Sequence, residues 1–226
     1  MFLELLRSQV AGMARELLKH NLVVLTGGNV SARDKETGAI VITPSGVSYE
    51  TMRADDVLVV NAAGEQIDGQ LRPSVDLATH LRIYEARQDI CAVMHTHSTY
   101  ATTLSLLGLR LPDLTTTLAY SNGPGGVDIA PYAHVYDPKF GENVVKALGD
   151  RHVVLLENHG VVACGATLKR CLQVALIVEQ VAQMYLVAKM VGEPKALASQ
   201  YAREIHAHYS TKYGQKAASD TLADAR

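Results

Sequence analysis

Three histidines in two separate stretches of the sequence have the types and spacing of a metal-binding site. His95 and His97 follow an apolar run at residues 90–94, which is typical of a buried strand. Because side chains two residues apart on a strand point to the same face, the two imidazoles should lie side by side. His159 comes shortly after a second apolar run, at residues 153–156. Three protein ligands leave a coordination position open, as in a catalytic zinc site.

A single histidine on an apolar strand is more often a packed core residue than a ligand, so the His-x-His pair alone leaves both interpretations open. The second, distant histidine favours the metal site. Zinc is the first expectation for such a site, and manganese, cobalt or iron would also suit histidine and oxygen ligands.

Two turns rich in glycine and small polar residues could bind an oxyanion. The first surrounds Gly27-Gly28 and carries Thr26 and Asn29, and the second carries Ser45 and Gly46. Their flexible backbone can present N–H groups to an anion. A plain tight turn between strands would explain each stretch equally well.

A third polar stretch begins a helix that we expect from about residue 75 to residue 87. Ser74 can cap this helix, and Asp76 in its first turn suits the helix dipole. These structural roles compete with functional ones. A helix N-terminus is also an anion site, and Asp76 could face the metal.

The bulk properties predict one large domain without a nucleic-acid or membrane partner. The chain has 226 residues, a net charge of −2 and an isoelectric point near 6.5. No secretory signal and no uninterrupted apolar run of membrane-spanning length are recognised. Cys91, Cys164 and Cys171 form no Cys-x-x-Cys pair, which favours reduced thiols in the cytoplasm.

Alternating strands and helices predict an α/β fold, a single domain with a mostly antiparallel or mixed central sheet and helices on both faces. The domain should span residues 1–213, followed by a flexible C-terminal tail at 214–226. We interpret residues 25–33 as a turn and residues 114–136 as short strands and loops. Strands are expected at 39–42, 57–60, 90–94, 153–156 and 161–164, and helices at 2–20, 75–87, 98–107, 138–148, 167–191 and 195–209.

Five motifs together resemble the class II aldolase/adducin family, and the resemblance extends from about residue 5 to residue 215. The family includes L-fuculose-1-phosphate aldolase, L-rhamnulose-1-phosphate aldolase and L-ribulose-5-phosphate 4-epimerase. In sequence order the motifs are Thr26-Gly27-Gly28-Asn29-Val30-Ser31, Thr43-Pro44-Ser45-Gly46, Arg72-Pro73-Ser74-Val75-Asp76, His95-Thr96-His97-Ser98 and Asn158-His159-Gly160.

The resemblance implies a role for each of these motifs. It implies a zinc ion on His95, His97 and His159, with Mn²⁺ or Co²⁺ as alternative ions. It implies Asp76 as the acid/base residue and Tyr213 as a catalytic residue that reaches the neighbouring subunit's site in a homotetramer. The substrate phosphate would be bound by Thr26, Asn29, Ser45, Gly46 and Ser74.

The activity implied is metal-dependent retro-aldol cleavage of a ketose phosphate, such as L-fuculose 1-phosphate, to dihydroxyacetone phosphate and an aldehyde. The alternatives are L-ribulose-5-phosphate 4-epimerase, a decarboxylase, or a non-catalytic member like adducin. Two departures bear on this choice. Val75 replaces the second serine of the phosphate pocket, and Tyr120 stands where the epimerase has its second acid/base aspartate.

Overall fold

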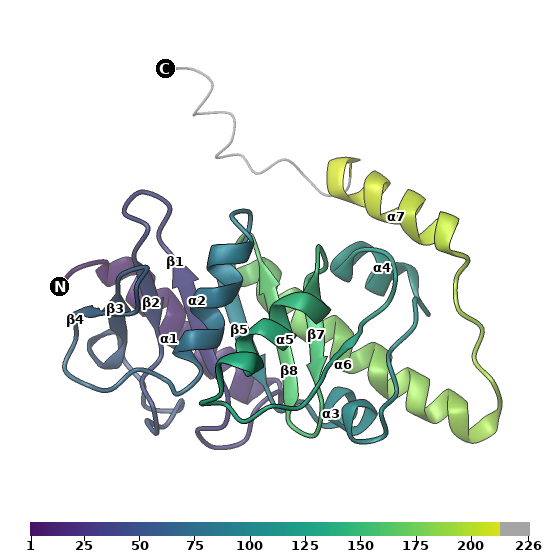
Figure 1. Cartoon of the computed structure of the whole chain (residues 1–226), viewed down its shortest axis with the longest axis horizontal. Coiled ribbons are helices and arrows are strands. Elements are labelled where there is room, and N and C mark those ends of the chain that lie inside the picture. Colours follow the sequence, from purple (N-terminus) through teal and green to yellow (C-terminus); the bar gives the residue numbers. More distant parts are fainter. Residues whose placement is uncertain (213–226) are drawn as a thin grey trace.

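The computed structural model describes residues 1–212 and contains one mixed sheet of eight strands (Figure 1). The strand order is β4-β3-β2-β1-β5-β8-β7-β6. Neighbouring strands pair antiparallel except β6 and β7, which pair parallel. The strands are β1 (Asn29–Arg33), β2 (Ile40–Ile42), β3 (Leu58–Val60), β4 (Gln66–Asp68), β5 (Ala92–Thr96), β6 (Ile129–Ala130), β7 (Val153–Leu156) and β8 (Gly160–Gly165).

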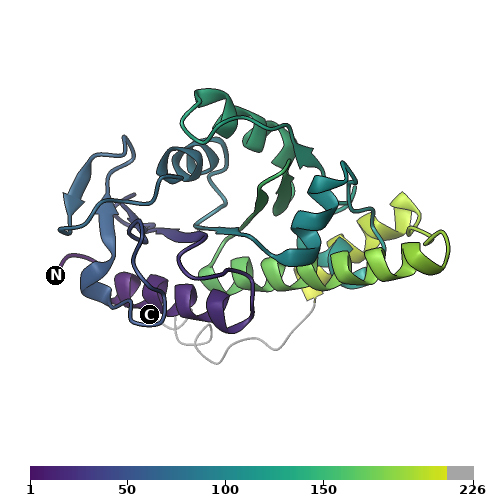
Figure 2. The same cartoon turned by 90° about the horizontal axis from the view of Figure 1, so that it is seen from below.

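Helices cover both faces of this sheet, as Figure 2 shows. One face is covered by α1 (Glu4–Lys19), α3 (Thr99–Leu106) and α6 (Leu168–Val191), and the other by α2 (Leu77–Ala86) and α5 (Pro138–Leu148). The period-two alternation of β2, β3, β5, β7 and β8 fills both cores. In β2, for example, Val41 packs into the core under α1 and α6, whereas Ile40 packs into the core under α2 and α5. The predicted α/β fold is therefore confirmed.

Two further helices lie together at one end of the molecule (Figure 1). They are α4 (Thr116–Asn122) and α7 (Ser199–Lys212), which pack against each other, and a short 3₁₀ helix, η1 (Ala54–Asp56), packs against α1. The prediction of short strands and loops over residues 114–136 was wrong for residues 116–122, which form α4, whereas β6 is a strand within this range. Thr115 caps α4 by accepting a hydrogen bond from the Leu118 N–H at 3.1 Å, and Gly123 ends the helix with φ 91°.

The interpretation of residues 25–33 as a turn was also wrong in its second half. Residues 29–33 form β1, a central strand, and four of its five side chains are buried. Asn29 and Ser31 alternate with Val30 and Ala32, as in a strand, but this alternation is short and directly follows Gly27-Gly28, which favoured the prediction of a turn. In the structure the two polar side chains contact polar groups on α2. The structure also adds β4 and starts the last helix at Ser199 instead of residue 195.

Helix α6 is long and apolar enough to cross a membrane by length and composition. It packs as a core helix, however, with buried residues that include Cys171, Val178 and Tyr185. Cys91, Cys164 and Cys171 are all buried and unpaired. The predicted tail at 214–226 and Tyr213 lie outside the described residues.

Candidate metal-binding active site

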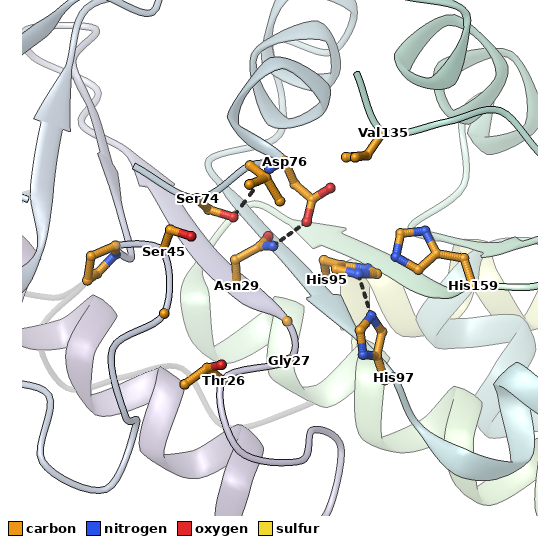
Figure 3. Close-up of a pocket in the computed structure, with 14 residues that line it drawn as sticks. Thr26, Gly27, Asn29, Ser45, Ser74, Asp76, His95, His97, Val135 and His159 are labelled. Carbon is orange, nitrogen blue, oxygen red and sulfur yellow. Dashed lines mark hydrogen bonds between the residues drawn. The ribbon is translucent and has the colours of Figure 1, made fainter. Parts of the chain in front are cut away.

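The three predicted histidines meet at one end of the central strands (Figure 3). His95 is the fourth residue of β5 and is 2% exposed, and His97 lies just beyond the end of that strand. His159 lies in the turn between β7 and β8, and β8 pairs antiparallel with β5. One nitrogen from each ring lies within 4.8 Å of the others, and the Nε2 atoms of His95 and His97 are 2.9 Å apart.

Burial favours neutral rings for the three histidines, and a hydrogen bond sets the tautomer of His95. The Nδ1 atom of His95 lies 3.0 Å from the Val161 carbonyl oxygen, so Nδ1 carries the proton and Nε2 is free to bind a metal. Burial lowers the pKa of His95 to about 3 and the pKa values of His97 and His159 below their ordinary range.

This donor set fits a divalent metal ion such as zinc. In a tetrahedral centre with Zn–N distances of about 2.0–2.1 Å, the ligand nitrogens are separated by ~3.3 Å. Small adjustments of the three rings would reach that separation. His97 is exposed and His159 is partly exposed, so a fourth position would face the cavity and remain open to substrate.

The close approach of strand β5 to the turn that carries His159 depends on Gly160. A Cβ atom at this position would lie 2.4 Å from the Thr96 carbonyl oxygen and 2.9 Å from Cδ2 of His97. The preceding turn also needs an uncommon backbone conformation, since Asn158 has φ 53°. The glycine and asparagine of the Asn-His-Gly motif are therefore explained by the geometry of the turn, and the histidine is explained by the proposed metal site.

Asp76 is placed beside the histidines by the start of α2. It is the N-cap residue of that helix and is 6% exposed. Its Oδ2 atom accepts a hydrogen bond from Nδ2 of Asn29 at 2.6 Å, and Asn29 pairs with His95 across β1 and β5. Its Oδ1 atom has no hydrogen-bond partner in the described part of the chain. The hydrogen bond from Asn29 thus orients the carboxylate, and its Oδ1 atom remains available for proton transfer.

Small polar residues form the other end of the cavity, across Asp76 from the histidines (Figure 3). The Ser45 N–H donates to the Arg72 carbonyl at 3.0 Å, and the Ser74 N–H donates to the Thr43 carbonyl at 3.1 Å. These two amides are therefore engaged within the protein. The side chains of Thr26, Ser45 and Ser74 line this end of the cavity and offer hydroxyl groups to an anion.

One cavity of about 240 Å³ collects every predicted site residue that the structure describes. Val75 also lines it, so the residue that replaces the family's second serine reaches the site. Val135 lines it as well, and the sequence analysis did not single this residue out because a valine in a loop carries no pattern. The predicted residues in the lining are Thr26, Asn29, Ser45, Gly46, Ser74, Asp76, His95, His97 and His159.

Two tyrosines were named in the sequence analysis, and the structure describes one of them. Tyr213 lies outside the described residues. Tyr120 lies on α4, where the Arg170 guanidinium stacks 4.3 Å from its ring centre and the Tyr209 ring lies 5.4 Å away. Tyr120 is therefore a packed aromatic within its own chain.

Comparison with known proteins gives the family. Residues 8–186 match the model of the Class II Aldolase and Adducin N-terminal domain. The 5-deoxy-D-ribulose 1-phosphate aldolase of Bacillus thuringiensis serovar kurstaki is 37% identical over 197 residues, which are 87% of this chain and 92% of that relative.

Solved structures agree with this match. An L-fuculose 1-phosphate aldolase superposes with a TM-score of 0.86 at 30% identity, covering 91% of this chain and 96% of that one. YgbL of Escherichia coli, described as a candidate aldolase/epimerase/decarboxylase, superposes with a TM-score of 0.80 at 25% identity, covering 90% and 98% of the two chains. With the family model matching most of its length, this chain belongs to the class II aldolase and adducin family.

Proposed function

We propose that this protein cleaves a ketose 1-phosphate to dihydroxyacetone phosphate and an aldehyde in a divalent-metal-dependent retro-aldol reaction. The observation that carries the proposal is the single cavity with three histidines at one end, hydroxyl side chains at the other and buried Asp76 between them. Two similar proteins are named as aldolases of 5-deoxy-D-ribulose 1-phosphate and L-fuculose 1-phosphate, both ketose 1-phosphates.

The cavity supplies a position for each part of such a substrate. The hydroxyls of Thr26, Ser45 and Ser74 would bind the phosphate. Val75 removes one hydroxyl donor that a serine would supply, so fewer bonds would hold the phosphate. His95, His97 and His159 would hold the metal, which acts when bound as a Lewis acid on the ketone carbonyl.

The proton transfers follow from the bonds that change. In cleavage the bond between C3 and C4 breaks, the C4 hydroxyl loses its proton as C4 becomes the aldehyde carbon, and C3 gains a proton. We assign the proton at C3 to Asp76, whose Oδ1 atom has no hydrogen-bond partner in the described part of the chain. The acceptor of the proton that leaves the C4 hydroxyl, whose oxygen becomes the aldehyde oxygen, is assigned to Tyr213 on the basis of the sequence resemblance alone.

The finer assignments are also proposals. We propose zinc as the native metal and a homotetramer with active sites between subunits. Val24 and Leu25, directly before the turn that carries Thr26, are 71% and 78% exposed, which suits a surface covered by a neighbouring subunit. The three unpaired buried cysteines suit a reducing compartment, and we propose the cytoplasm.

The first experiment combines metal analysis with a retro-aldol assay. The zinc-loaded protein is offered 5-deoxy-D-ribulose 1-phosphate, L-fuculose 1-phosphate and L-ribulose 5-phosphate. Release of dihydroxyacetone phosphate is followed by its reduction with NADH and glycerol-3-phosphate dehydrogenase. We expect triose phosphate from at least one ketose 1-phosphate, and loss of this activity on chelation. A protein with one zinc per chain that releases no triose phosphate from either ketose 1-phosphate would contradict the proposal.

Asp76→Asn tests the assignment of the proton carrier. The amide keeps the size of the side chain but cannot carry the proton, so we expect kcat to fall by about 10²–10⁴-fold with zinc content unchanged. Asp150→Asn, an exposed position away from the cavity, is the matched control and should leave kcat unchanged. Equal turnover by both variants would remove Asp76 from the mechanism.

The second candidate function is L-ribulose-5-phosphate 4-epimerase. It is favoured by the aspartate at position 76 and by the Lys212-Tyr213-Gly214-Gln215 string, both of which resemble the epimerase. The same assay separates the two activities, because an epimerase would convert L-ribulose 5-phosphate to its C4 epimer without releasing triose phosphate.

A further inference from the structure

A histidine outside the metal triad, His80, is buried beside Asp76 with one ring nitrogen unbonded. His80 is 0% exposed. Its Nδ1 atom lies 2.7 Å from Oγ of Ser31, and the same Oγ atom lies 2.7 Å from the hydroxyl of Tyr84. The Nε2 atom of His80 has no partner among residues 1–212. The proposed reaction leaves this buried polar chain without a role.

This series of polar contacts arises because residues four apart on α2 have nearly the same separation as residues two apart on β1. Asp76, His80 and Tyr84 are four residues apart and lie on one side of the helix, with about 6 Å between successive positions. Asn29 and Ser31 are two residues apart on one face of β1, with about 6.6 Å between them. Asn29 therefore meets Asp76, and Ser31 meets His80.

The hydrogens that each group carries determine which group donates in the Tyr84–Ser31 and Ser31–His80 hydrogen bonds. Burial raises the pKa of Tyr84, so its hydroxyl keeps a hydrogen that needs an acceptor. In the described part of the molecule, Ser31 Oγ is the one polar atom that this hydroxyl contacts. Tyr84 therefore donates to Ser31, and the hydroxyl hydrogen of Ser31 is donated to Nδ1 of His80.

The ring hydrogen of His80 must then be on Nε2. Burial lowers the pKa of His80 to about 4, so the ring is neutral near pH 7 and carries one hydrogen. The Nε2 atom of His80 and the Oδ1 atom of Asp76 are both buried without partners in the described chain. Both residues line one internal gap that has no room for a water molecule. The opposite tautomer would turn a lone pair toward this gap beside the carboxylate.

We propose that His80 is a positioning residue for Asp76. In this proposal the Nε2–H of His80 donates to Oδ1 of Asp76, two atoms that have no other partner in the described structure, while Asn29 holds Oδ2 and the carboxylate is oriented for proton transfer. Each carboxylate oxygen has two lone pairs, so this bond leaves one for the substrate proton. Tyr84 and Ser31 determine which nitrogen of His80 donates. The inference rests on the proposed role of Asp76.

The first test measures the tautomer of His80 directly. Two-bond ¹H–¹⁵N correlations of the histidine rings are recorded for wild-type protein labelled with ¹⁵N-histidine, with and without zinc. The His80 signals are assigned by their loss in His80→Gln. We expect the Nε2–H tautomer, and the Nδ1–H tautomer would overturn the proposal. This readout needs no turnover, so its failure is separate from a failure of the proposed function.

The second test compares two substitutions that each retain a polar group at the position of one ring nitrogen of His80. The side-chain amide of His80→Gln reaches the position of Nε2, so it can still donate toward Asp76. The side-chain amide of His80→Asn reaches only the position of Nδ1, so it keeps the partner of Ser31 and loses the donor.

We expect His80→Gln to keep kcat within about threefold of wild type and His80→Asn to lower it tenfold or more, with KM and zinc content unchanged in both. Equal kcat values, or a more active His80→Asn, would overturn the proposal. The tautomer measurement on the wild-type protein decides the question if either variant does not fold.

Discussion

At the scale of single residues, Gly160 controls how closely the two histidine-bearing segments approach. A Cβ atom there would lie 2.4 Å from the Thr96 carbonyl oxygen and 3.1 Å from Cε1 of His95. Because strand β5 and the ligand rings would have to move, we expect Gly160→Ala to lower the free energy of unfolding by roughly 1–3 kcal/mol. We also expect it to weaken zinc binding at least tenfold, measured by competition with a chelating dye.

Gly12→Ala is the matched control for this substitution. Gly12 lies inside α1, and the nearest atom to an added Cβ is the end of the Arg15 side chain at 3.8 Å. Alanine favours a helix over glycine, so this variant should gain about 0.5–1 kcal/mol and bind zinc as the wild type does. Two variants with equal zinc affinity would show that the strand approach does not shape the metal site.

Much of the candidate site could be predicted from the types and order of its residues. Side chains whose role depends on tertiary packing could not be predicted in this way. His95, His97 and His159 follow apolar runs, and the His-x-His pair together with the distant third histidine favours a metal site. His80 and Val135 show no such pattern. The position of His80 against Asp76 depends on how α2 lies on β1, which no single stretch of sequence specifies.

At the scale of elements, helix α3 begins two residues after His97, a proposed metal ligand, and is capped from another helix. Ser98 is its N-cap residue, but the Ser98 side chain caps no N–H group, and its hydroxyl lies 2.9 Å from Oγ1 of Thr96. Glu179 of α6 accepts hydrogen bonds from the Tyr100 and Ala101 N–H groups, both at 2.9 Å. A carboxylate at a helix N-terminus also interacts favourably with the helix dipole.

Glu179→Ala should therefore destabilise the protein by about 1–2 kcal/mol, because two N–H groups at the helix start lose their acceptor. The measurement is the urea midpoint of unfolding. Gln183→Ala, one turn along α6, is the control, since its amide bonds only the exposed hydroxyl of Tyr100 in the described structure. It should change stability by less than about 0.5 kcal/mol. Similar losses in both variants would contradict the role of Glu179 as a cap.

The elements that were predicted correctly are those with strong apolar periodicity. Helices α1 and α6 and strands β5 and β7 have such patterns, and the structure places them close to the predicted ranges. Strand β1 and helix α4 were missed for a common reason. Their side chains are mostly small and polar, so tertiary partners on α2, α6 and α7, not local periodicity, determine their structure.

At the scale of the whole molecule, buried histidines make stability depend on pH. Burial lowers the pKa of His152 to about 4, with smaller contributions from the nearby charges of Arg87 and Arg170. The unfolded chain has an ordinary histidine pKa near 6.5, so between about pH 4 and 6.5 it binds more protons than the folded chain. The contribution of His152 to stability is therefore present above pH 6.5 and is lost as the pH falls toward 4.

His152→Gln should remove this dependence, because glutamine does not titrate. We expect the wild type to lose about 1–2 kcal/mol more than His152→Gln between pH 7 and pH 5, measured by urea unfolding of the metal-free proteins. Carboxylates titrate alike in both proteins, so their effects cancel in the comparison. His20→Gln, at an exposed histidine that follows α1, should retain the wild-type dependence. Parallel stability curves for wild type and His152→Gln would show that His152 does not resist protonation in the folded protein.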